Sequence, residues 1–170
     1  MSEVTNTTGT CPFCRPDIQK NAFAASGSFL ALYNKAPILP GHTLIIPGVH
    51  IESLRSLTDD QISVFFRFAR EVTETLLSYF HADAFDWSIQ DNTAAGQTVP
   101  HLHLHIIIRH TADLPAPGDW YPLLDAWEKR GSDDRPQLSA NDYEKITARL
   151  RSAYNLRREI SDIRLGNFRK

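Results

Sequence analysis

The sequence predicts an α+β protein with a mostly antiparallel sheet and one long helix. Two apolar, β-prone segments, 29–33 and 43–46, flank a connection rich in proline and glycine, which is typical of a hairpin. A segment with helical periodicity follows them, and a further β-prone segment lies at 101–109. A long helix beside strands that follow one another along the chain indicates an α+β architecture.

The long helix, expected at about 59–80, has the clearest start signal in the chain. Thr58 and Gln61 have the spacing of a capping box, and two acidic residues occupy the first turn. Apolar residues then recur at helical spacing: Ile62, Phe65, Phe66, Ala69, Val72, Leu76 and Phe80. This pattern predicts a helix with one apolar face against the sheet.

The chain changes character after Arg109, where proline-rich and Gly-Ser-Asp turn signals appear. We therefore expect a main domain over 1–110, with 1–10 frayed, and a C-terminal extension over 111–170. The extension should hold at least one helix, at about 140–154. Before Arg109, residues 86–90 are expected to form a strand.

Composition excludes several classes of protein. Of the 170 residues, 42% are apolar and 22% charged, as in ordinary globular chains, and the net charge of −2 argues against a dedicated nucleic-acid binder. No apolar run approaches the roughly 20 residues that span a bilayer. The first ten residues have neither the basic start nor the apolar stretch of a signal peptide, so we expect a cytoplasmic protein.

Three histidines at alternate positions carry the strongest chemical signal. Alternation in a strand places His101, His103 and His105 on one face and the intervening leucines on the other. The outer two would lie roughly 13 Å apart, too far for all three to bind one metal readily. At least one imidazole should therefore be available as a nucleophile or proton carrier.

These histidines belong to a longer pattern that resembles a known family. Residues 95–107, AGQTVPHLHLHII, resemble the signature of the histidine triad (HIT) superfamily, and residues 40–47, PGHTLIIP, resemble its PGH element. The resemblance covers about residues 11–110 and implies a compact HIT-like fold, a homodimer formed by joining two sheets, and a nucleotide substrate. We expect no membrane association and no organic cofactor.

The resemblance also implies roles for individual residues. His103 would attack the α-phosphorus and form a nucleotidyl intermediate, while His105 and Gln97 would hold the phosphate oxygens. The expected nucleotide-binding residues are Asn34, His42, Gln90, Gln97, Thr98 and His105.

Gln90 resembles the fragile histidine triad (Fhit) branch, which hydrolyses dinucleoside polyphosphates, whereas phosphoramidase-type members usually have asparagine there. A phosphoramidase, or a nucleotide-binding signalling module with little turnover, remains the alternative. A third interpretation is a zinc enzyme that uses the three histidines as ligands.

The only two cysteines, Cys11 and Cys14, form a CxxC motif that suits either a redox pair or a metal site. A redox CxxC follows a buried strand, and nothing before Cys11 could form one, so a zinc site is favoured. Many microbial histidine triad proteins have this motif. The resemblance to them implies that His50 and His101 complete a structural zinc site with the two thiolates.

Overall fold

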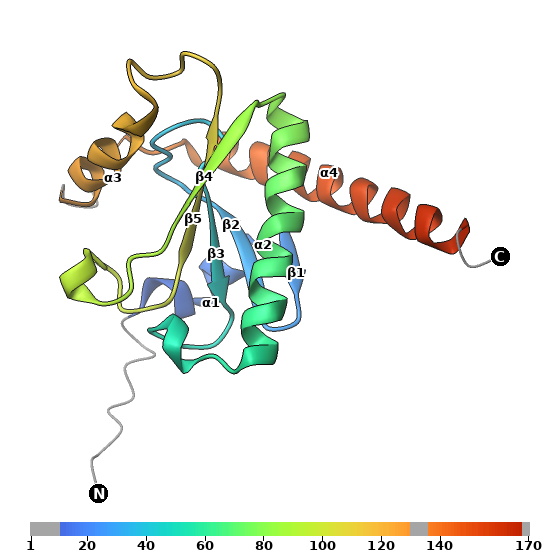
Figure 1. The fold of residues 1–170 in the computed structure, drawn as a ribbon, viewed down its shortest axis with the longest axis horizontal. Helices are drawn as coiled ribbons and strands as arrows, with labels where there is room; N and C mark the ends of the chain where they lie inside the picture. Colours follow the sequence, from blue (N-terminus) through green and yellow to red (C-terminus); the bar gives the residue numbers. More distant parts are fainter. Residues whose placement is uncertain (1–10, 130–135, 168–170) are drawn as a thin grey trace, which may run out of the picture.

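The computed structural model describes residues 11–129 and 136–167, and it confirms the α+β class. A five-stranded antiparallel sheet has the strand order β1-β2-β3-β5-β4, and the long helix α2 lies alongside it (Figure 1). The strands are β1 Ala24–Ser26, β2 Phe29–Tyr33, β3 Thr43–Pro47, β4 Ala84–Ser88 and β5 Leu104–Arg109.

The hairpin of β2 and β3 is present, and its connection brings the chain close to β5. Tyr33 pairs with Thr43, and every residue of β3 is buried. Gly41 has a φ of 92°, and a Cβ there would lie 2.9 Å from the Cβ of Ile108. Only glycine tolerates both the positive φ and this close approach. The next residue, His42, is thereby held against β5.

Helix α2, Asp59–Phe80, begins at the predicted capping box. The Thr58 hydroxyl accepts a hydrogen bond from the Gln61 backbone N–H, and the Gln61 side chain accepts one from the Thr58 N–H. The helix buries its apolar face against the sheet, and its most buried residues are Phe65, Phe68, Ala69, Val72 and Leu76. This layer between helix and sheet is the main hydrophobic core.

Strand β4 differs from the expected 86–90 because it starts at Ala84 and ends at Ser88. Its pairing with β5 runs from Ala84 opposite Arg109 to Ser88 opposite His105. Since β5 begins at Leu104, residues beyond Ser88 have almost no strand left to pair with. The same limit leaves His101 and His103 in the segment that leads into β5 rather than within the strand.

Two helices follow the sheet: α3, Trp120–Lys129, and α4, Ala140–Asn167. Helix α4 starts where expected but continues well past 154, since no glycine or proline interrupts the sequence before Gly166. Leu150 and Tyr154 are buried in the main core, whereas the later turns are exposed and run out from the body (Figure 1). Within the described ranges, no helix is long and apolar enough to cross a membrane.

Candidate active site

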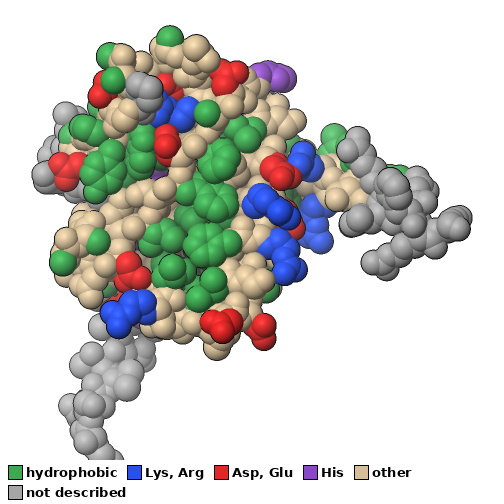
Figure 2. Space-filling model, viewed as in Figure 1, with side chains coloured by type: hydrophobic (Ala, Val, Ile, Leu, Met, Phe, Trp, Pro, Cys, Tyr) green, Lys and Arg blue, Asp and Glu red, His purple; other side chains and the backbone are tan. Residues whose placement is uncertain are grey.

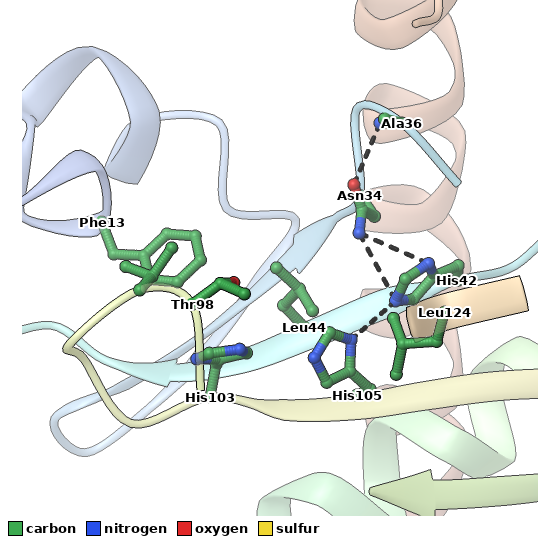
Figure 3. A pocket seen from close by; sticks show the side chains of 10 residues that line it. Phe13, Asn34, Ala36, His42, Leu44, Thr98, His103, His105 and Leu124 are labelled. Atoms are coloured by element: carbon green, nitrogen blue, oxygen red, sulfur yellow. Dashed lines mark hydrogen bonds between the residues drawn. The ribbon is translucent and has the colours of Figure 1, made fainter. Parts of the chain in front are cut away.

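A cavity of about 190 Å³ lies where β2, β3 and β5 come together (Figure 3). Two of the three alternate histidines, His103 and His105, face it, together with His42 and Asn34. The remaining lining residues are Phe13, Ala36, Leu44, Thr98, Val99 and Leu124. Five of the predicted site residues, Asn34, His42, Thr98, His103 and His105, thus line one cavity.

The protonation of His103 is fixed by a backbone carbonyl. Its Nδ1 lies 2.7 Å from the carbonyl oxygen of His101, which can only accept, so Nδ1 carries the hydrogen. The lone pair of the neutral ring is then on Nε2. Burial lowers the pKa of His103, which keeps the ring neutral near pH 7. His103 therefore has the form that a nucleophilic imidazole requires.

A second chain of hydrogen bonds fixes the tautomer of His105. The backbone N–H of Ile38 donates to Nδ1 of His42 over 3.3 Å, so the hydrogen of His42 is on Nε2. That Nε2 donates to Nδ1 of His105 over 2.9 Å. Burial lowers the pKa of His42 to about 3 and that of His105 well below its ordinary value. Neutral His105 consequently carries its hydrogen on Nε2 and can donate it to an oxyanion.

Asn34 follows directly after β2, and its side chain points toward the same histidines. Its Oδ1 accepts a hydrogen bond from the Ala36 N–H over 2.9 Å, which orients the amide. Its Nδ2 then lies 3.3 Å from Nδ1 of His42. The amide is positioned at the edge of the cavity by the chain's own turn.

Gln97 does not line the cavity. Its Oε1 accepts a hydrogen bond from the Asn92 N–H over 2.9 Å, and its Nε2 donates to the carbonyl oxygens of Glu52 and His101. Gln97 therefore ties the loop before the histidines to the backbone. Its predicted contact with phosphate remains a prediction.

Gln90 does not line the cavity either. It is buried, and its Nε2 donates to Oγ of Ser88 over 2.8 Å. Its predicted contact with nucleotide remains a prediction.

Sequence reasoning missed Phe13 and Leu124 as cavity residues. The ring of Phe13 lies edge-on to those of His101 and His103, with centroid distances of 5.5 Å. The available signal was its position between Cys11 and Cys14, because two cysteines that come together with histidines also fix the residues between them. Leu124 of α3 is buried over the site, and nothing in its local sequence distinguishes it from other helical leucines.

The third alternate histidine, His101, faces a separate cluster. One ligand atom from each of Cys11, Cys14, His50 and His101 lies within 4.8 Å of all the others, an arrangement that could hold a metal ion. The imidazole Nδ1 atoms face the sulfurs: Cys11 Sγ lies 3.4 Å from His101, and Cys14 Sγ lies 3.4 Å from His50.

Groups around this cluster orient its imidazoles. His101 donates through Nε2 to the Pro47 carbonyl, and His50 donates through Nε2 to Glu52, which leaves both Nδ1 lone pairs for a cation. Burial and the neighbouring Cys11 raise the pKa of Cys14 to about 11. A bound cation would reverse that shift, because metal binding deprotonates a coordinating thiol.

The three alternate histidines thus divide between two neighbouring sites, with His103 and His105 at the cavity and His101 at the thiol cluster. The HIT domain family matches residues 15–112, more than half of the chain, and the chain belongs to this family.

Curated relatives carry names of dinucleoside polyphosphate hydrolases. The bis(5'-nucleosyl)-tetraphosphatase [asymmetrical] of Schizosaccharomyces pombe is 45% identical over 83 residues, which cover 49% of this chain and 46% of the relative. The bifunctional bis(5'-adenosyl)-triphosphatase/adenylylsulfatase FHIT of Arabidopsis thaliana is 34% identical over 110 residues, which cover 65% of this chain and 61% of the relative. The chain thus spans about half to three-fifths of these two relatives.

A solved structure extends the likeness of fold over most of the chain. The Zn-bound histidine triad family protein from Mycobacterium smegmatis superposes with a TM-score of 0.66 at 22% identity, covering 90% of this chain and 99% of that one. At this identity, the match shows the fold alone.

Proposed function

We propose that the protein is a nucleotide hydrolase that cleaves at the α-phosphorus of a dinucleoside polyphosphate or a related nucleotidyl conjugate. The observation that carries this proposal is the pairing of a neutral, correctly protonated His103 with a hydrogen-bond donor on His105 in one cavity. The names of the curated relatives support the substrate class.

In this mechanism Nε2 of His103 attacks the α-phosphorus, and the bond from phosphorus to the leaving phosphate oxygen breaks. Nε2–H of His105 donates to a non-bridging oxygen, where charge builds up. Water then attacks the nucleotidyl-His103 intermediate, releases a nucleoside monophosphate and restores the neutral imidazole. Thr98, at the cavity wall, is proposed to contact the leaving group, and Gln97 to position the loop around the phosphate.

A second, larger cavity of about 640 Å³ is proposed to hold the nucleoside. It shares Phe13, Asn34 and Leu44 with the small cavity, so the two adjoin at these residues. Leu32 and Leu44 form an apolar cluster along it, suited to a base. Asn34, between the two cavities, is proposed to bind the ribose.

The experiment that tests the function is incubation with diadenosine tri- or tetraphosphate, followed by chromatography of the products. Attack at the α-phosphorus predicts AMP from either substrate, accompanied by ADP or ATP respectively. Symmetric cleavage of the tetraphosphate to ADP alone would contradict attack at the α-phosphorus. Binding of AMP without turnover of either substrate would favour a phosphoramidase or a binding module.

We propose that the thiol–imidazole cluster holds a structural zinc ion. Zinc in a tetrahedral Cys₂His₂ site, with bonds of about 2.0 to 2.3 Å, separates its ligand atoms by about 3.3 to 3.8 Å. The sulfur-to-nitrogen distances of 3.4 to 3.6 Å fit this spacing closely. Four protein ligands would fill the coordination sphere, so zinc would fix the fold rather than bind substrate.

We propose that the protein is cytoplasmic, and the redox state of the thiols bears on this location. Cys11 and Cys14 must stay reduced to bind zinc, which suits the reducing cytoplasm. Fractionation of the source cells would check this location.

We propose that the protein forms a homodimer through strand β4. In the described part of the chain, β4 pairs with β5 alone and forms one edge of the sheet. Phe85 on β4 is 45% exposed, and its ring lies 5.5 Å from that of Trp87, which stacks on Phe66 of α2. Figure 2 shows hydrophobic side chains gathered over the middle of the face where Figure 1 draws β4 and α2. An open edge beside an apolar patch suits a symmetric partner.

Light scattering should give wild-type protein twice the 19.2 kDa chain mass, and Phe85→Lys should shift it to the monomer mass. The reason is that a lysine on this patch would bury an unpaired charge in the interface. The matched control is Leu156→Lys, the same change at an exposed apolar residue of α4, which should leave the dimer intact. A wild-type monomer, or a dimer that survives Phe85→Lys, would rule out this interface.

A further inference from the structure

The C-terminal helix α4 forms one wall of the larger cavity. Ala140, Tyr143 and Glu144 line this wall, and all three lie outside the matched residues 15–112. We propose that Tyr143 and Glu144 are specificity-determining residues that select a purine base bearing an exocyclic amine. This inference rests on the proposed function, because it assigns the base to the larger cavity.

The start of α4 is fixed to the sheet rather than loosely attached. The backbone N–H of Leu138 donates to the carbonyl oxygen of Lys35 over 2.9 Å, directly after the segment that carries Asn34. Ser139 caps the helix, since its hydroxyl accepts a hydrogen bond from the Asp142 N–H. The first turn of α4 is therefore held at a defined distance from the ribose-binding position.

Packing further along α4 keeps this wall in place. Leu150 is fully buried, and Tyr154 lies edge-on to Phe68 of α2 and donates to Glu71. Arg151 donates to the carbonyl oxygen of Ala22 over 2.9 Å, which joins α4 to the segment before β1. A wall anchored on both sides can discriminate between ligands, because it cannot yield without breaking these contacts.

The order of the two cavities places a base next to Tyr143. With the α-phosphorus at His103 and the ribose at Asn34, the base falls in the larger cavity between the Leu32–Leu44 floor and α4. Tyr143 is half-buried and packs on the main core, so its ring is held in one orientation. An aromatic ring fixed in this way favours the larger surface of a purine, since stacking strength grows with the area in contact.

The exposed carboxylate of Glu144 lies at the rim of the cavity. An ionised carboxylate only accepts hydrogen bonds, so it prefers a base edge with N–H donors. Adenine and guanine each offer the two N–H donors of an exocyclic amine, whereas hypoxanthine and uracil offer only a single ring N–H beside their carbonyl oxygens. Lys20 and Lys35, which also line the cavity, can donate to ring nitrogens or to the guanine carbonyl. Asp17 is the remaining charged residue of the lining, and it is paired with Arg15. Glu144, Lys20 and Lys35 therefore complement an aminopurine.

The test is calorimetric titration of the full chain with AMP, GMP, IMP and UMP. Wild type should bind AMP and GMP about tenfold more tightly than IMP and UMP, as expected for one charge-assisted contact and one stack. Glu144→Gln should reduce the preference for GMP over IMP at least about threefold. The matched control, Glu159→Gln, is the same change on the exposed part of α4 and should leave the preference unchanged.

Tyr143 is tested by two further variants. Tyr143→Phe keeps the ring and should bind AMP as wild type does, whereas Tyr143→Ala should bind it about tenfold more weakly. Because Tyr143 also packs on the core, its removal is compared at a temperature where both variants show native circular dichroism. Glu144→Gln, at an exposed position, gives a reading that does not depend on core packing.

The outcomes separate this inference from the proposed function. If wild type binds AMP but Glu144→Gln and Tyr143→Ala leave the base preference and affinity unchanged, α4 has no role in selection and the inference is wrong. If wild type binds none of the four nucleotides, the nucleotide site itself is wrong. If Glu144→Gln loses the base preference of wild type but still forms AMP from diadenosine tetraphosphate, the result would support both the inference and the proposed function.

Discussion

His103→Ala is expected to abolish the covalent intermediate and to lower hydrolysis of diadenosine tetraphosphate by about 10³-fold or more. No other imidazole of the site is set up to replace it: His42 and His105 use their Nδ1 atoms as acceptors and share a hydrogen bond. Rapid quenching followed by mass spectrometry of the intact protein should show one added nucleotidyl group on wild type and none on the variant.

The control for this experiment is His110→Gln, which removes an imidazole outside the cavity and should retain the adduct. His103→Ala should still bind AMP, because the nucleoside cavity is unchanged. An adduct on His103→Ala would show that another residue is the nucleophile.

Adduct formation on wild type should also persist at low pH. Since burial lowers the pKa of His103, the neutral imidazole should persist below pH 6.5, and adduct formation should continue where an exposed histidine is protonated.

Cys14→Ser is expected to abolish binding of the proposed zinc ion and to lower the melting temperature by about 10 °C. Cys14 contacts both imidazoles of the cluster, so its loss leaves three ligands and frees the segment that holds Phe13 against His103. Elemental analysis of wild type purified without chelator should give one zinc per chain, and the variant should contain none.

Two further variants test the proposed zinc site, one that should weaken zinc binding and one control that should not. Glu52→Gln weakens the acceptor for His50 Nε2–H, so it should keep the zinc but lower its affinity about tenfold. His81→Asn changes an exposed histidine with a positive φ, which asparagine tolerates, and it should match wild type in metal and melting temperature. Zinc-free wild type, or full zinc in Cys14→Ser, would exclude the proposed site.

Local signals predicted the elements that depend on local interactions. Helix α2 starts at its capping box because Thr58 and Gln61 satisfy each other's backbone, whatever surrounds them. The end of β4 depends instead on where its partner β5 begins, which residues 86–90 do not encode. Helix α4 runs past the expected end because its helix-forming sequence continues beyond Tyr154, the last residue that it buries in the core.

The same distinction applies to the site. Alternation placed three histidines on one face, but position along that face decides the surroundings: His101 reaches the cysteines, whereas His103 and His105 reach the cavity. Tyr143 and Leu124 enter the cavities from segments far along the chain, and only folding brings them there. No spacing rule within one segment can predict such contacts.

The side chain and the main chain of His101 have different roles. Its imidazole belongs to the thiol cluster, while its carbonyl sets the protonation of His103. Every amino acid supplies that carbonyl, so the protonation of the proposed nucleophile is insensitive to which residue occupies position 101, provided the backbone keeps its course. A lineage could thus lose the cluster by point mutation and still inherit a neutral imidazole with its lone pair on Nε2. The two properties are free to evolve apart although they meet in a single residue.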